Sequence, residues 1–418
     1  MLISRNLSKE RVLEMKATFS SGVAGWFRRN AWSLLVLLLA ALLFVGFRVS
    51  LRKPADAVPL SGDYAEYEKG TVVSVLTDNC FSDPASDGAM RGEQQLLVNV
   101  KSGQYSGEQL LVYNYVGPLS GVSVHEGDSV SLIISTYGDG SHRATVFEFN
   151  RSPMLLLVVC LFFAVTVLVG RRTGFKSLVA LVVTVAVLFY VLLPLLLRGF
   201  PTLPTVFLVC VYITLVSFTI LGGVRRKTLC AMLGTVAGFT LAMLFGLLAQ
   251  ALCRVDGLRM PDVEPLLQLR QTGTPIGLRG LLAAGIIVSA LGAVMDVSMS
   301  IASSLEEIHS ANPELGFRAL FRSGMNIGQD LVGTMTNTLI LAFLGSGFTT
   351  ILYLYSLGLA RYQLFPSAYL SIEVISGVSS SIGMILAIPL TAAVSALLIE
   401  RKKTPAAKPQ AANSRQKK

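Results

Sequence analysis

The sequence has few charged residues for its length. Asp, Glu, Lys and Arg make up 14% of the 418 residues, whereas apolar residues make up 52%. Soluble domains average about 25% charged residues, so this charge is too little to cover a globular surface. The abundance of Leu, Val, Ile and Phe excludes intrinsic disorder. Five cysteines are too sparse, and odd in number, for a disulfide scaffold. The class that remains is a multi-pass membrane protein.

Motifs of common enzymes are missing as well. The chain has no Walker A motif, no His-Glu-x-x-His and no Gly-x-Ser-x-Gly. Its three histidines, His125, His142 and His309, lie outside the predicted membrane spans and show no metal-ligand spacing. We therefore expect no enzymatic activity, no catalytic residues and no cofactor, whereas the sequence leaves a metal site open.

Long apolar runs predict eight membrane-spanning helices, because a helix needs about 20 apolar residues to cross the hydrocarbon. They lie at residues 31–47, 152–170, 177–197, 204–222, 228–252, 280–304, 329–358 and 373–398. We expect the first to be a retained anchor, because its long core is followed at once by Arg48, Arg52 and Lys53 rather than by a cleavage site. The segment 329–358 is longer than one crossing and contains Gly345-Ser346-Gly347, so a tilted, a kinked and a broken helix all stay open.

Basic residues predict the orientation, since cytoplasmic loops are enriched in Lys and Arg. Basic clusters at 171–176, 225–227 and 318–322 alternate with the spans in a way that places both termini in the cytoplasm. We expect a plasma-membrane protein whose basic N-terminus and basic tail are both cytoplasmic. The net charge of +10 then reflects topology rather than nucleic-acid binding, so no nucleic-acid partner is expected.

Residues 60–150 differ in composition from the spans and are rich in charge, Gly and Asp. Alternating runs predict five strands, at 70–77, 94–100, 109–115, 129–136 and 143–149. Five short strands in one small segment are typical of a Greek-key barrel of the oligonucleotide/oligosaccharide-binding (OB) type.

The predicted fold class is therefore mainly α: a polytopic helical membrane bundle with an extracytoplasmic, OB-like small β-barrel inserted between the first and second spans. Along the chain, the predicted parts are a cytoplasmic N-terminus (1–30), a first span (31–50), the outer β-rich domain (60–150), spans two to five (152–252), spans six to eight (280–398) and a cytoplasmic tail (399–418).

The last three predicted spans carry polar residues at helical spacing, so that each set shares one helix face. In the sixth span these residues are Ser289, Gly292, Asp296, Ser300, Ser303 and Glu307. In the seventh they are Asn326, Asp330, Gly333 or Thr334, and Asn337, and in the eighth they are Glu373, Ser376 or Gly377, Ser380 and Thr391.

Small and hydroxylated residues on one face are also how helices pack in lipid. Packing does not need a carboxylate, and an ionised Asp costs about 2.5–3.5 kcal/mol within hydrocarbon. Asp296, near the middle of its span, is therefore the most informative residue. The predicted transport path, or proton or ion site, consists of Asp296, Ser300, Ser303, Asn326, Asp330, Thr334, Asn337, Glu373 and Ser380.

Three segments carry a family resemblance: residues 295–308, reading MDVSMSIASSLEEI, residues 325–328 with Asp330, and residues 333–342, reading GTMTNTLILA. On these motifs the chain resembles the YibE/F-like family of bacterial multi-pass membrane proteins, most strongly over 280–395. The resemblance implies a bacterial integral membrane protein, and it implies no activity.

The polar faces favour a transporter or permease for an unidentified small solute or ion, with its path lined by spans six to eight. The alternative is a non-transporting membrane scaffold or sensor whose outer β-domain binds a partner. The expected partners are the lipid bilayer, a small solute or ion, and either a second copy of the chain or a cytoplasmic protein at residues 305–325.

Overall fold

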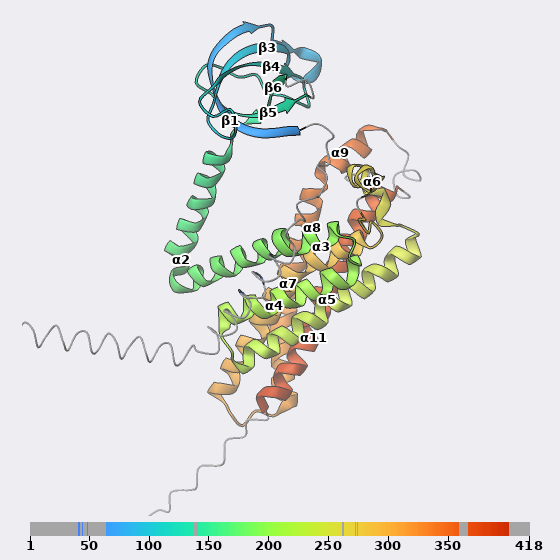
Figure 1. Ribbon diagram of the computed structural model, residues 1–418. Coiled ribbons are helices and arrows are strands. Elements are labelled where there is room, and N and C mark those ends of the chain that lie inside the picture. The colour runs from blue at the N-terminus through green and yellow to red at the C-terminus, as the bar shows by residue number, and fades with distance from the viewer. Residues whose placement is uncertain are drawn as a thin grey trace, which may run out of the picture. The chain divides into compact units, whose positions relative to one another are not determined.

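A computed structural model describes residues 64–137, 141–260, 263–271, 273, 275–358 and 367–400, together with Ala41, Phe44 and Arg48. The chain divides into two compact units (Figure 1). One consists of Lys53–Val169, and the other of Met1–Arg52 with Gly170–Lys418. The predicted first span at 31–47, apart from Ala41 and Phe44, and the terminal segments 1–30 and 401–418 lie outside the described residues.

The first unit contains a closed β-barrel. Its strands are β1 (Tyr64–Asp78), β2 (Phe81–Asp83), β3 (Ala89–Val100), β4 (Gln109–Val116), β5 (Ser129–Thr136) and β6 (His142–Phe149). Five of them follow the order β1-β5-β6-β4-β3, and β3 pairs back with β1 to close the barrel. The pair β4–β6 is parallel and the other pairs are antiparallel. These five strands confirm the five predicted from the sequence, while β2 is an addition that extends the edge of β3.

Alternating burial explains why these segments form the barrel. Along β4 the residues Leu110, Val112, Asn114 and Val116 are buried, whereas the intervening ones face outward. Inward-facing aliphatic side chains from the other strands complete the core. Among the described residues, the barrel precedes the first candidate membrane span rather than lying between two of them.

One polar network crosses this apolar core. The Gln94 amide, which is fully buried, donates to the Val124 carbonyl at 3.1 Å and to Asp78 Oδ2 at 3.0 Å. Its Oε1 accepts from Asn114 Nδ2 at 2.9 Å and from the Val124 N–H at 3.1 Å. The network fastens the loop between β4 and β5 across one end of the barrel. The Cys80 backbone N–H, and then the Gln94 amide, hold the pKa of Asp78 below its usual value.

We predict that Gln94→Leu lowers the unfolding free energy of residues 60–150, expressed alone, by about 1–3 kcal/mol, because the buried Val124 N–H loses its acceptor. The measurement is urea unfolding followed by circular dichroism, which should show a β-type spectrum before unfolding. Gln95→Leu, at the neighbouring outward-facing position, is the matched control. Equal midpoints for the two variants would show that the network does not stabilise the barrel.

The second unit is helical. Its elements, together with the helix that leads into it, are α2 (Ser152–Val187), the π-helix η2 (Leu188–Leu192), α3 (Leu193–Leu197), α4 (Thr202–Gly222), α5 (Arg226–Cys253), the 3-10 helix η3 (Gly257–Arg259), α6 (Glu264–Gln271), α7 (Leu281–Ala311), α8 (Phe317–Ser346), α9 (Phe348–Ser356) and α11 (Ala368–Glu400). Within the described residues, five helices are long and apolar enough to cross a membrane, or six if the bent pair α8–α9 is one span.

The stretch Ser152–Leu197 counts as one of these five, whereas the sequence predicted two spans within it. At 1.5 Å per residue it is about 70 Å long, more than twice the hydrocarbon thickness. The backbone leaves helical geometry at Arg171, with φ 49° and ψ −128°. The stretch is therefore not one straight crossing.

Helix α8 begins at Phe317, well before the predicted start at residue 329, because a helix does not stop at the edge of its apolar segment. The break lies at Gly347, where α8 and α9 meet at a bend of 59°. Of the three conformations left open for this segment, the structure shows the broken helix, with its break at the Gly-Ser-Gly sequence.

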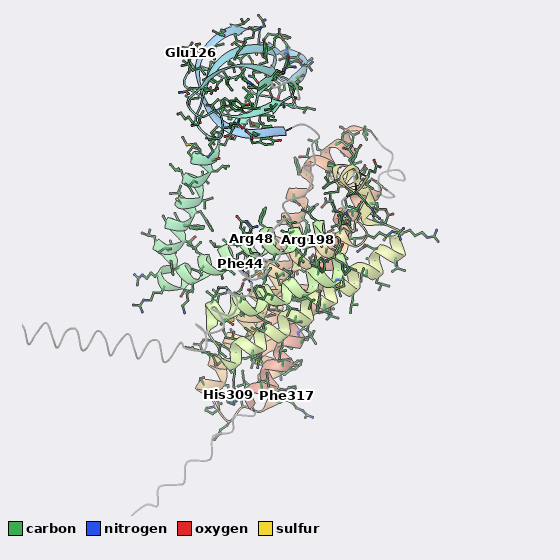
Figure 2. All side chains as sticks on the ribbon, in the orientation of Figure 1. Phe44, Arg48, Glu126, Arg198, His309 and Phe317 are labelled. Atoms are coloured by element: carbon green, nitrogen blue, oxygen red, sulfur yellow. The ribbon has the colours of Figure 1, made fainter. Side chains whose placement is uncertain are left out.

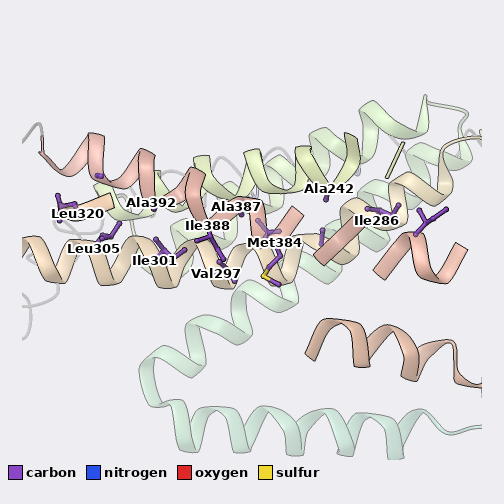
Figure 3. Packing of buried hydrophobic residues seen from close by; sticks show 14 of the residues in the cluster. Ala242, Ile286, Val297, Ile301, Leu305, Leu320, Met384, Ala387, Ile388 and Ala392 are labelled. Atoms are coloured by element: carbon purple, nitrogen blue, oxygen red, sulfur yellow. The ribbon is translucent and has the colours of Figure 1, made fainter. Parts of the chain in front are cut away.

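Small residues bring α5, α7 and α11 together in the centre of the bundle. A Cβ placed on Gly238 of α5 would lie 2.6 Å from Val294 Cγ1 and 2.7 Å from Ala387 Cβ. Figure 3 shows buried side chains of α5, α7 and α11, including Ala242, Ile286 and Met384, in the same core. Close approach at small residues is how helices gain van der Waals contact in lipid, where no hydrophobic effect drives their association.

We predict that Gly238→Ala lowers the thermal stability of the detergent-solubilised protein, because the added methyl overlaps two buried side chains and overpacking costs about 1–3 kcal/mol. Gly345→Ala is the control, since nothing lies within 4 Å of a Cβ at that helical glycine. Melting curves of the two variants and the wild type make the comparison. A Gly238→Ala melting temperature equal to that of Gly345→Ala would argue against the tight crossing.

Candidate functional site

The polar residues predicted on the sixth span form an uncovered face of α7. Gly292, Asp296 and Ser300 are exposed, and Ser303 is half-buried. The opposite face of the same helix is fully buried, with Val294, among others, in the core. Among the described residues, Asp296 has no hydrogen-bond or ion-pair partner. Gly292, Asp296 and Ser300 therefore share one exposed face of the helix, whereas Ser289 of the same predicted set is half-buried.

Helix α8 repeats this arrangement. Asn326, Asp330, Thr334 and Asn337 are all exposed. The other side of α8 packs on α11 through glycine: a Cβ placed on Gly324 would lie 2.8 Å from Ala392 Cβ. The Thr334 hydroxyl turns back to its own helix, 3.3 Å from the Leu331 carbonyl. The polar faces of α7 and α8 thus lie opposite the side chains that hold both helices to the bundle.

Ser380 of α11 lies on neither uncovered face and reaches the predicted polar set of α7 only at Ser289. It is fully buried, and its hydroxyl lies 2.9 Å from that of Ser289 on α7. Asn337 is exposed on the far side of α8, so Ser380 and Asn337 do not line a common lumen. The three helices instead meet at apolar residues such as Leu305 and Ile388 (Figure 3).

Glu373 lies apart from the other predicted residues. It is half-buried near the start of α11, beside the break between α8 and α9. A Cβ placed on Gly347 would lie 3.2 Å from the Glu373 carboxyl carbon. Glycine at 347 therefore leaves room for this carboxyl group at the bend.

A second buried hydroxyl pair joins Thr391, which the helical spacing had included, to Ser298, which it had missed. Thr391 of α11 donates to Ser298 of α7 at 3.2 Å, and both side chains are fully buried. Ser298 lies between the exposed positions Asp296 and Ser300, so the spacing rule that found the polar face passed over it. The available signal was its position on the apolar face of the helix; in the structure its partner Thr391 lies against Gly234 of α5.

One end of the bundle carries a pair of opposite charges. Lys227 at the start of α5 lies 3.2 Å from Glu306 on α7. His309 near the end of α7 and Phe317 at the start of α8 lie at this same end (Figure 2). Within the described ranges, no three His, Cys, Asp or Glu residues come together as a metal-binding group. The uncovered faces of α7 and α8 are therefore the site that the chemistry of the chain singles out.

Long apolar helices packed at small residues, together with a separate small barrel, define a multi-pass membrane protein. The chain belongs to the YibE/F-like family: the model of that family, described as YibE/F-like protein, matches residues 158–401, more than half of the chain. The matched range includes both polar faces and leaves the barrel outside. No curated protein and no solved structure matches the chain.

Proposed function

We propose that the protein is a membrane transporter or permease for a small solute or ion, and that the uncovered polar faces of α7 and α8 line its path. The observation that carries this proposal is Asp296, an exposed carboxylate without a partner, in an otherwise apolar helix. Hydrocarbon disfavours a charged Asp by about 2.5–3.5 kcal/mol. Water or protein must therefore cover this face when the helix lies in the bilayer.

The residues of the two faces indicate the sign of the transported species. Asp296 and Asp330 are acidic, and no basic side chain lies between Gly292 and Ser303 on α7 or between Asn326 and Asn337 on α8. Such a lining attracts cations and can exchange protons. A proton or another small cation fits it better than an anion. The proposal involves no covalent chemistry, and α11 contributes packing rather than lining, apart from Glu373 at the bend.

The proposed topology follows from the basic clusters. Both termini are cytoplasmic, the chain crosses the membrane eight times, and the barrel is an OB-type domain outside the cytoplasm, between the crossings at 31–47 and 152–170. The break at Arg171 supports two crossings in Ser152–Leu197, because residues 152–170 alone are about 28 Å long at 1.5 Å per residue. That length matches the hydrocarbon core.

Cysteine labelling tests this topology. In a chain whose five native cysteines are replaced, Ser106→Cys in the barrel should react with a membrane-impermeant maleimide in intact cells. Glu314→Cys, in the loop between α7 and α8, should react only after permeabilisation. Both side chains are exposed, so access to reagent decides the outcome. Labelling of Glu314→Cys in intact cells would invert the assignment.

Asp296→Asn tests the path. The purified protein is reconstituted into phosphatidylethanolamine–phosphatidylglycerol vesicles loaded with a pH-sensitive dye, and proton flux is driven by a potassium diffusion potential. We expect the substitution to reduce flux about tenfold or more, equivalent to about 1.4 kcal/mol of barrier, while membrane abundance stays unchanged.

The matched control is Glu307→Gln, which removes the same charge from the same face near the C-terminal end of α7. This variant should retain flux. If Asp296→Asn transports as well as the wild type, the proposed path is wrong.

A scaffold or sensor is the second candidate, favoured by the separate barrel. Residues 64–149 contain eleven acidic and four basic residues, a net charge of −7, although the whole chain is basic. On the outer surface, Tyr67 and Phe147 are exposed and meet edge to face, with ring centroids 5.4 Å apart. This surface suits a cationic or apolar partner rather than a nucleic acid. Full activity of Asp296→Asn in cells, without measurable flux in vesicles, would favour this candidate.

A further inference from the structure

The uncovered faces of α7 and α8 pose a question that the proposed function does not answer, namely what covers them within the bilayer. We propose that a second copy of this chain does so, and that the path lies at the interface between two copies. This inference rests on the proposed function for the role of the interface. The interface itself follows from the uncovered faces and is tested separately below.

Glycines on these faces point to a closely approaching helix. A Cβ placed on Gly285 or Gly292 of α7, or on Gly333 of α8, would meet nothing within 4 Å. Glycine is less favourable than alanine inside a helix, and the described part of the chain provides no contact that requires it there. At membrane interfaces, small residues allow two backbones to approach closely. A face that contacts only lipid does not require small residues.

Within the part of the chain that the structure describes, no other segment supplies the cover. Phe44 lies against Tyr190, with ring centroids 6.2 Å apart, and Arg48 lies over the same ring at 4.6 Å. Phe44 and Arg48 therefore contact η2 rather than α8. Residues 152–169 contain only Cys160 and Thr166 as polar side chains within the helix beyond Ser152, and the Thr166 hydroxyl donates to its own helix at Phe162. That helix therefore provides no free hydroxyl donor for the carboxylates of Asp296 and Asp330.

The faces complement each other when paired between copies. Helices α7 and α8 are antiparallel and joined by residues 312–316, so depth can be counted from this loop. Asp296 lies about 24 Å from it and Thr334 about 27 Å at 1.5 Å per residue. Asn337 lies about 32 Å away, but its side chain leans back toward the loop while that of Asp296 leans away from it. A second copy would thus bring the amide donor of Asn337 to the depth of the carboxylate.

Self-complementarity is the reason for choosing a second copy over another membrane protein. The two faces hold acceptors in Asp296 and Asp330 and amide donors in Asn326 and Asn337. A two-fold axis along the membrane normal keeps equal depths together and forms each α7–α8 contact twice. Neither face alone offers the same balance, since the carboxylate near mid-membrane lies on α7 and the amides lie on α8.

Cross-linking between differently tagged copies tests the interface. Two full-length chains without native cysteines are co-expressed, one with Gly292→Cys and the other with Gly333→Cys. Neither substitution meets a neighbour within its own chain. In native membranes, a bis-maleimide should give a band that carries both tags, at about 90 kDa, twice the 44.8 kDa of one chain.

The control pair is Leu208→Cys on α4 with Leu244→Cys on α5, which are 66% and 52% exposed and apolar. Doubly tagged product from the Gly pair well above that from the Leu pair supports the interface. Equal amounts from the two pairs overturn it.

A second measurement covers the case in which the cysteine-free chains fail to insert. The wild-type chain, fused to a fluorescent protein and reconstituted at low density, should bleach in two steps per particle, whereas one step overturns the proposal. Neither experiment depends on transport. An inactive dimer would therefore refute the proposed function alone, and an active monomer would refute the interface alone.

Discussion

Hydrocarbon offers no hydrogen-bond partner to a polar side chain, and this constraint governs the arrangement of the helical unit. Two polar pairs lie inside the bundle, Ser289 with Ser380 and Ser298 with Thr391. The charges of Lys227 and Glu306 are paired at the bundle end. Asp296 differs, because the described part of its chain provides no partner for this exposed carboxylate. The proposed path and the proposed interface between copies both rest on this unpartnered carboxylate.

Much of the fold could be predicted because it depends on local signals. Alternation of apolar residues located five barrel strands, with most strand ends correct to within a few residues. The exceptions are β1 and β3, which begin earlier than predicted. Apolar runs located the helices. The early start of α8 and its bend at Gly347 were harder to predict from the sequence. A helix continues beyond its apolar segment when its polar residues still favour helix, and a Gly-Ser-Gly sequence permits a bend without specifying one.

The sequence predicted which polar residues share a helix face, but not how the three helices pack against one another. Spacing alone shows that Asp296 and Ser300 share a face, since it depends only on helix geometry. Which face turns inward depends on contacts between distant segments, such as Gly238 with Ala387 and Gly324 with Ala392. The sequence therefore suggested one lumen among three helices. In the structure Ser380 is part of the packed core, while the faces of α7 and α8 point away from it.

The central claim is that the α7 face meets protein or water rather than lipid, and a spin label at Ser300→Cys measures this most directly. Its collision rates with oxygen, which concentrates in hydrocarbon, and with a water-soluble nickel chelate are compared with those of a label at Leu208→Cys, an exposed apolar position on α4. The account predicts lower oxygen and higher nickel accessibility at residue 300 than at residue 208. Equal, lipid-type accessibility at both positions would contradict it.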